Sequence, residues 1–230
     1  MTVHRTLDAG LVGIKQRLME MAGYVEAAIE CATKGWRSRS VDQIQNVYQI
    51  EKKVNECHLA IDDACFKFLA TQQPLASDLR FVLSAFKINN DLERIVDQAV
   101  NVAGNTEYYL KTPAQISTND LSLMADQSKW MVRNAIDAFV KGDETLAQEV
   151  CLRDDKVDEL KDKIFTDTLA TIKKDVSSVE QGLNLILIAR NLERIGDHAT
   201  NIAEDVIFTI SGKDIRHSNP NANPDGSPKP

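Results

Sequence analysis

Apolar residues recur three and four positions apart along most of the chain, and this spacing predicts amphipathic helices. Between Ile88 and Ala103, for example, they fall at positions 88, 92, 95, 99, 102 and 103. Capping residues and glycines divide the pattern into six segments. The predicted helices cover residues 8–34, 41–71, 76–110, 119–141, 144–174 and 178–211. Several exceed 30 residues, which is typical of a bundle of long helices.

Residues that break regular structure are scarce before the end of the chain. The 230 residues include 10 glycines and 6 prolines, and only Pro74 and Pro113 precede residue 212. A sheet protein of this length needs turn residues at short, regular intervals. The sequence therefore predicts an all-α fold of long antiparallel helices. Residues 213–230, rich in Asn, Pro, Asp and Ser, are predicted to be a disordered tail.

The chain also contains an internal repeat. The segment 92–103 aligns with 192–203, and eight of the twelve positions are identical. Further upstream, residues 51–55 align with 154–158. Because the order of elements is the same in both halves, we expect two tandem three-helix bundles. The predicted domains are residues 1–113 and 114–212.

One polar ridge recurs in the two repeats. Residues four apart on a helix advance only about 40° around its axis, so they form a slanting row. The apolar residues of the same helix centre roughly 160° away, which turns each row toward solvent. The two rows consist of Glu93, Asp97 and Asn101 in the first repeat and Glu193, Asp197 and Asn201 in the second.

A second acidic pair precedes the ridge of the second repeat. Asp154 and Asp158 are one helical turn apart and flank the apolar stripe of their helix, so they can face Glu193 and Asp197. Carboxylate and amide oxygens are the ligands that Mg²⁺, Mn²⁺, Ca²⁺ and ferric iron accept. Solvated acidic faces are common, but solvent alone would accept Lys or Gln at these positions. The repetition therefore favours metal binding.

Composition and the absence of known motifs exclude several classes of function. The net charge of −7 argues against nucleic-acid binding, which requires a basic surface. The chain shows neither a secretory signal nor an apolar run long enough to span a membrane, which predicts a cytoplasmic protein with reduced cysteines. His198 projects away from Glu193 and is predicted to be a surface residue. No nucleophile–base pair or phosphate-binding loop is present, so we expect no enzyme activity.

Three segments together resemble the PhoU family: residues 73–80, 92–97 and 192–203. The resemblance covers residues 5–217 and implies two three-helix PhoU domains in a protein that forms homodimers. It also implies metal sites at the (E/D)xxxD motifs, with magnesium or manganese ions, or iron or zinc clusters. In this sequence the sites are Glu93/Asp97, Glu193/Asp197 and Asp154/Asp158. Glu51 is the first-repeat counterpart of Asp154, but Asn55 breaks its carboxylate pair, so the first site is expected to be weaker or to take another metal.

The resemblance implies a regulatory function. A PhoU protein represses the phosphate-starvation (Pho) regulon and restrains phosphate uptake when phosphate is abundant. Its expected partners are the ATPase subunit of the phosphate ABC transporter and a phosphate-sensing histidine kinase, through which it reaches the membrane only indirectly. Three alternatives stay open: a paralogue serving another transporter, a carboxylate di-iron or ferritin-like protein, and a purely structural helical scaffold.

Overall fold

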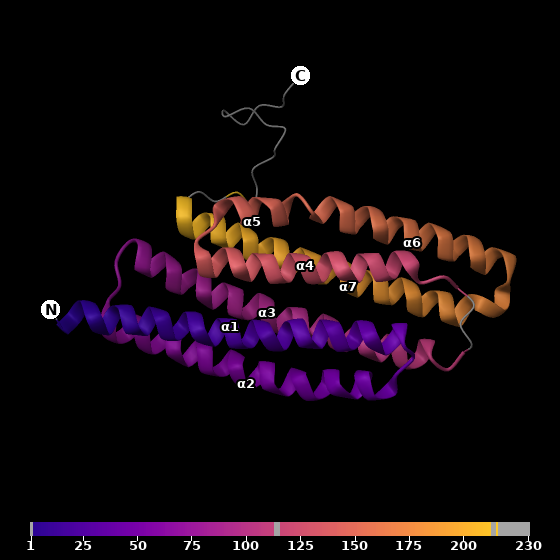
Figure 1. Ribbon diagram of the computed structural model, residues 1–230, viewed down its shortest axis with the longest axis horizontal. Helices are drawn as coiled ribbons and strands as arrows, with labels where there is room; N and C mark the ends of the chain where they lie inside the picture. Colours follow the sequence, from indigo (N-terminus) through magenta and orange to yellow (C-terminus); the bar gives the residue numbers. More distant parts are fainter. Residues whose placement is uncertain (1, 113–115, 213–214, 216–230) are drawn as a thin grey trace, which may run out of the picture.

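The computed structural model describes residues 2–112, 116–212 and 215, and within them all regular structure is helical. The helices are α1 (Thr2–Arg37), α2 (Val41–Gln72), α3 (Ser77–Tyr109), α4 (Asn119–Lys141), α5 (Glu144–Cys151), α6 (Asp154–Lys174) and α7 (Val179–Ser211). A short 3₁₀ turn, η1 (Val176–Ser178), precedes α7. The helices lie nearly parallel to the long axis of an elongated molecule (Figure 1). The all-α class predicted from the periodicity is confirmed.

The helices form two three-helix bundles that lie side by side (Figure 1). The first bundle is α1, α2 and α3, and the second is α4, α7 and the α5–α6 pair. The most extensive packing in the molecule joins α3 to α7, and α1 also contacts α4. The two repeated helices that carry the polar ridges are therefore the central helices of the fold.

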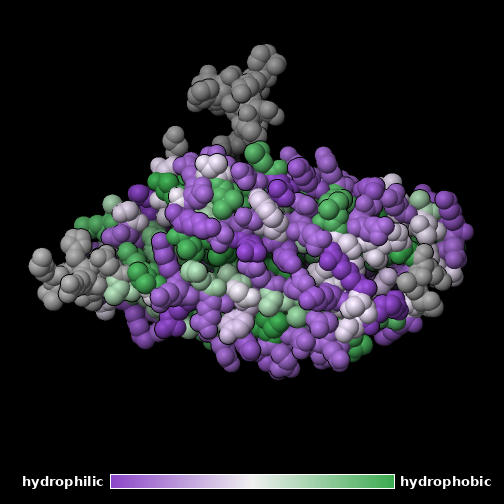
Figure 2. All heavy atoms as spheres, viewed as in Figure 1, coloured by the Kyte–Doolittle hydropathy of each residue, from purple (hydrophilic) through white to green (hydrophobic). Residues whose placement is uncertain are grey.

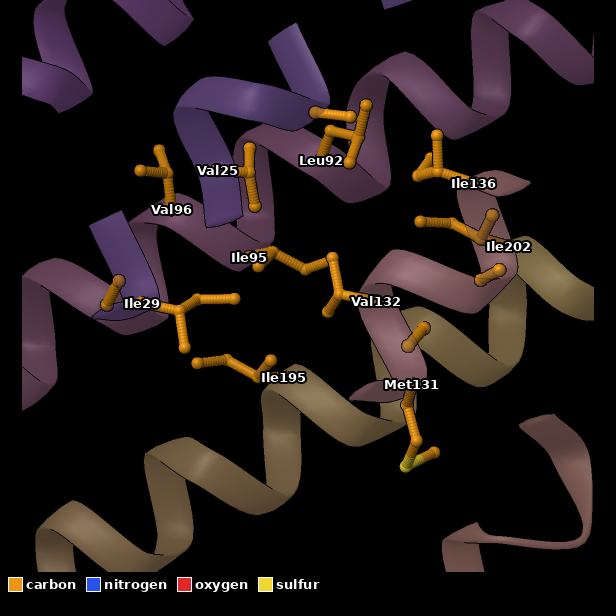
Figure 3. Close-up of a cluster of buried hydrophobic side chains, with 14 of the residues drawn as sticks. Val25, Ile29, Leu92, Ile95, Val96, Met131, Val132, Ile136, Ile195 and Ile202 are labelled. Carbon is orange, nitrogen blue, oxygen red and sulfur yellow. The ribbon is translucent and has the colours of Figure 1, made fainter. Parts of the chain in front are cut away.

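One hydrophobic core runs through both bundles. Ile29 and Ile95 from the first bundle approach Val132 and Ile195 from the second (Figure 3). Each of these four side chains is at most 1% exposed. Because aliphatic side chains from α1, α3, α4 and α7 share this cluster, the two bundles bury apolar surface against each other and are held together by the hydrophobic effect.

Local capping explains where several helices begin and end. The Ser40 hydroxyl accepts a hydrogen bond from the Gln43 amide at the start of α2, and the Asp143 carboxylate accepts one from the Leu146 amide at the start of α5. Gly142 ends α4 with a φ of 67°, a left-handed conformation that glycine adopts without strain. The predicted starts at residues 41 and 144 are confirmed.

The predicted helix 144–174 is divided into α5 and α6 at Leu152 and Arg153. The Arg153 guanidinium lies 3.6 Å from the centre of the Trp130 ring and donates a hydrogen bond to Gln127 Oε1, both on α4. The break also places Asp154 in the first turn of α6, where the helix dipole favours a negative charge. A contact with another helix, which periodicity cannot reveal, accompanies the interruption.

The visible surface in Figure 2 is mostly hydrophilic, with small apolar patches. Within the described part of the chain, no helix is both long enough and apolar enough to cross a membrane. All four cysteines are free thiols. The predicted domain boundary at residue 113 and most of the predicted tail, residues 213–230, lie outside the described residues.

Candidate metal-binding ridges on the central helices

The two polar ridges lie on the outward faces of the central helices. We call Glu93, Asp97 and Asn101 of α3 the first-half ridge, and Glu193, Asp197 and Asn201 of α7 the second-half ridge. In both ridges the glutamate is half-buried, whereas the aspartate and the asparagine are more exposed to solvent, although the aspartates are still partly covered. The intervening apolar residues of both helices are buried in the core. The outward orientation predicted from the 3.6-residue period is confirmed, and it disfavours a di-iron site, whose carboxylates project into the bundle.

Carboxylates from α6 approach the second-half ridge. Partial burial, followed by the charges of Asp197 and Asp158, raises the pKa of Asp154 to about 6, and the Thr200 hydroxyl opposes this rise. Partial burial and the charges of Glu193 and Asp158 likewise raise the pKa of Asp197. Asp154 and Asp158 of α6 therefore interact electrostatically with Asp197 of α7, as expected for two facing helices. Their mutual repulsion favours a cation among them.

Gly196 is the residue of α7 that faces Asp154. A Cβ atom at this glycine would lie 3.6 Å from Asp154 Oδ1 and 3.5 Å from Val157 Cγ1. The corresponding residue of α3 is Val96, whose side chain is fully buried. The absence of a side chain at residue 196 thus leaves room for the α6 carboxylate beside the second-half ridge.

A lysine of α6 already lies among these carboxylates. The Lys161 Nζ atom is 3.1 Å from Glu193 Oε1, 3.3 Å from Asp158 Oδ1 and 3.7 Å from Asp162 Oδ1. The hydrogen bond to Glu193 raises the pKa of Lys161 above its usual range, so the ammonium form is favoured. The sequence analysis missed this residue. The spacing of three between Asp158 and Lys161 was the available signal, because residues three apart share a helix face.

The first-half ridge has a different set of neighbours. Partial burial and the charge of Glu51 on α2 raise the pKa of Asp97, and Arg94 opposes the rise. Glu51 also accepts a hydrogen bond of 2.9 Å from the Asn55 side-chain amide. The structure therefore places Glu51 near Asp97, as the alignment of the repeats predicts. One neutral amide stands where the second half has the Asp158 carboxylate.

Residues of the second-half ridge also connect the two bundles. His198 Nδ1 lies 2.9 Å from Asp91 Oδ1 of α3, and the Asn201 amide donates to the same oxygen at 3.5 Å. In the first-half ridge, the Asn101 amide donates to Gln98 Oε1 at 3.5 Å. His198 is only 18% exposed in its side chain, so the prediction of a surface residue is corrected to a contact between the bundles.

The donor atoms of the second-half ridge and of the facing α6 carboxylates are of the kind that binds a hard metal ion. Carboxylate oxygens from α6 and α7 are suitable ligands for Mg²⁺ or Mn²⁺, and burial and repulsion disfavour their all-ionised form. Among the described residues, however, no three His, Cys, Asp or Glu side chains are positioned to hold a metal ion. Lys161 pairs with two of the four carboxylates at this site.

Comparison with known proteins decides the family. The family model described as the PhoU domain matches twice, at residues 18–106 and 121–206. These two matches include both ridges and correspond to the two halves of the internal repeat. The chain belongs to the PhoU family. The resemblance seen in the repeated motifs is thereby confirmed.

Individual PhoU relatives match most of this chain. A phosphate-specific transport system accessory protein PhoU homolog from Pseudomonas aeruginosa is 33% identical over 216 residues, covering 94% of this chain and 89% of the relative. The phosphate-specific transport system accessory protein PhoU of Escherichia coli K12 is 30% identical over 210 residues, covering 91% and 87%.

Solved PhoU structures have the same fold. The crystal structure of PhoU from Pseudomonas aeruginosa matches with a TM-score of 0.87 and 33% identity, covering 90% of this chain and 99% of that chain. The phosphate transport system regulatory protein PhoU from Streptococcus pneumoniae matches with a TM-score of 0.83 and covers 90% and 98%. At 24% identity, the latter supports the fold alone.

Proposed function

We propose that this chain is an accessory protein of a phosphate-specific transport system. In this function it represses the phosphate-starvation regulon and restrains phosphate uptake when phosphate is abundant, without catalysing a reaction. The observation that carries the proposal is membership of the PhoU family over both repeats. Relatives that match more than nine-tenths of this chain are named as accessory proteins of phosphate-specific transport.

Metal binding at the ridges is the second part of the proposal. Asp154, Asp158, Glu193 and Asp197 would hold an ion in the second half, with Asn201 at the end of the ridge. Glu51, Glu93, Asp97 and Asn101 would serve in the first half. The ion supplies positive charge that carboxylates on two helices can share. With an ion bound, carboxylates of α6 and α7, and of α2 and α3, would no longer repel one another, so the ridges would link helices within each bundle.

The third part concerns partners. We expect a cytoplasmic homodimer that contacts the transporter's ATPase subunit and the phosphate-sensing histidine kinase. Long helices can present broad faces to helices of another protein. The exposed positions of both ridges make them accessible to such partners.

The regulatory proposal is tested by deleting the gene in the source bacterium and measuring a phosphate-starvation reporter in phosphate-rich medium. We expect high reporter output, which the wild-type gene returns to its repressed level. Co-purification with the ATPase subunit and with the kinase tests the adaptor function in the same strain. Unchanged reporter output in the deletion strain would instead favour a paralogue that serves another transporter.

Metal binding is tested separately on protein purified without an affinity tag or a chelator. Titration with Mn²⁺ should saturate the wild-type protein. The double variant Glu193→Gln/Asp197→Asn should lose second-half binding, and the matched variant Glu93→Gln/Asp97→Asn should lose first-half binding. If both double variants bind as much Mn²⁺ as the wild type, the ridges are not the metal sites.

A further inference from the structure

Lys161 gives the second-half ridge a built-in cation. Its ammonium contacts Glu193 on the adjacent helix and Asp158 on its own helix, at 3.1 and 3.3 Å. The side chains of Lys161 and Glu193 are 30% and 22% exposed, so this ion pair is partly shielded from water. An ammonium has three N–H donors and one positive charge, which it directs here at candidate ligand oxygens.

In the part of the chain that the structure describes, no lysine ammonium contacts the first-half ridge. In the alignment of α2 with α6, the residue that corresponds to Lys161 is His58. The His58 ring instead approaches the Asn89 carbonyl oxygen, at 3.4 Å, and Asp62 Oδ2, at 3.6 Å. Within the described ranges, neither Glu93 nor Asp97 forms an ion pair with a lysine or arginine. The built-in cation therefore distinguishes two ridges that have the same residues in their central helices.

We infer that Lys161 is a tethered counter-cation that competes with a metal ion for Glu193 and Asp158. This inference rests on the proposed metal binding at the second-half ridge. An ion that binds both carboxylates would lie close to the ammonium, and at that separation the two positive charges repel each other, so metal binding favours departure of the ammonium. Lys161 thereby lowers the metal affinity of the half that has more carboxylates.

A cavity beside Lys161 can accept its side chain when the ammonium leaves Glu193. Lys161 and Glu193 border a cavity of about 330 Å³ that is also lined by Phe165, Ile186 and Arg190. The four-carbon stem of a lysine can lie along apolar surface while its ammonium stays in water. We therefore expect the ammonium to leave Glu193 by a change of side-chain rotamers.

The exchange also predicts a difference in stability. Without metal, Lys161 offsets the repulsion among the α6 and α7 carboxylates, and a neutral residue at this position leaves that repulsion unopposed. With metal bound, the lysine is dispensable. The loss of Lys161 should therefore lower the unfolding temperature of the metal-free protein and increase the upward shift that metal produces.

The experiment measures Mn²⁺ binding to the full chain in a Glu93→Gln/Asp97→Asn background, so that only the second-half ridge is titrated. We expect Lys161→Gln to bind Mn²⁺ about threefold to fivefold more tightly, which is the upper range of the effect of losing a partly solvent-exposed ion pair. Lys161→Arg should bind like its parent because it keeps the charge. Lys163→Gln is the matched control, since Lys163 lies on the same helix but pairs with Asp120 of α4, at 2.7 Å.

Circular dichroism and thermal unfolding with and without Mn²⁺ report the fold of each variant and the predicted difference in the metal-induced shift. Equal, measurable Mn²⁺ affinities for Lys161→Gln and its parent would overturn the inference and leave the metal site in place. An absence of Mn²⁺ binding in both would overturn the metal proposal and the inference together. Tighter binding by Lys163→Gln as well would show a general charge effect and would also overturn the inference.

Discussion

The two ridges show how one helical motif acquires different properties in two halves of a protein. Both place a glutamate, an aspartate and an asparagine on the outward face of a central helix. The second half adds Asp154 and Asp158 and a lysine that pairs with two of its carboxylates. The first half has Glu51, hydrogen-bonded to a neutral amide. The ridge sequence alone is therefore a poor guide to the electrostatic environment of the ridge, because the neighbouring helix sets the charge around it.

The two halves also differ in the residue that follows the Glu-Arg-Ile sequence common to both ridges, which is valine at position 96 and glycine at position 196. Val96 is fully buried, whereas Gly196 leaves space that Asp154, Val157 and Met131 approach to within 3.7 Å of where a Cβ atom would be. The space that the Val96 side chain fills in the first half is thus filled in the second half mainly by residues of α6. The comparison predicts that substitutions at these two positions have opposite signs.

The largest expected effect is at Val96. Val96→Gly removes a fully buried side chain and introduces glycine into the interior of α3. The resulting cavity and the loss of helix propensity should together lower the free energy of unfolding by about 3 kcal/mol. Urea denaturation followed by circular dichroism measures this change. A loss below about 1 kcal/mol would show that Val96 contributes little to the core.

A smaller effect of opposite sign is expected at Asp154 in metal-free protein. Because its folded-state pKa is raised to about 6, the folded protein binds more protons than the unfolded chain between about pH 4 and pH 6. Stability contributed by this group is therefore highest at low pH and is lost as pH rises through that window. Asp154→Asn should raise the free energy of unfolding at pH 7 by about 1–2 kcal/mol, after allowance for solvent screening.

Urea denaturation at pH 4 and pH 7 checks this prediction. The gain from Asp154→Asn should largely disappear at pH 4, where the wild-type carboxyl is protonated. Glu51→Gln in the first half is the matched variant, and its gain at pH 7 should be smaller because Glu51 accepts a hydrogen bond from the neutral Asn55, whereas Asp154 is repelled by Asp158. Equal gains in the two halves would remove the electrostatic distinction between the ridges.

The smallest effect is expected at Gly196. An added Cβ atom would meet its neighbours at 3.5 Å or more, which is ordinary van der Waals distance. Gly196→Ala should therefore raise the free energy of unfolding by about 0.5–1 kcal/mol through helix propensity. Gly182→Ala on the same helix is the control, since its Cβ atom would lie 2.7 Å from Ile172 Cδ1 and 2.9 Å from Cγ2 of the buried, β-branched Thr168, and should destabilise the protein. Thermal unfolding of both variants distinguishes a general glycine effect from local packing.

Much of the candidate site could be predicted because it lies within single helices. The four-residue spacing of Glu193, Asp197 and Asn201 fixes their common direction, and the apolar positions between them fix the opposite face. The repeat then identified α2 and α6 as the helices that flank the ridges. Lys161 and Asp91 were missed because their significance depends on contacts with another helix, at Glu193 and at His198.

The sequence by itself determined the helical class, the duplication and the outward direction of both ridges, because these follow from the period of the α-helix and from internal similarity. Only the tertiary structure decided that α3 and α7 pack against each other, that the fifth predicted helix breaks at Leu152 and Arg153, and that an ammonium lies among the second-half carboxylates. The physical reason is that a helical period specifies the direction of a side chain about its own axis. The distance to a charge on another helix depends on how the shared core packs the helices together.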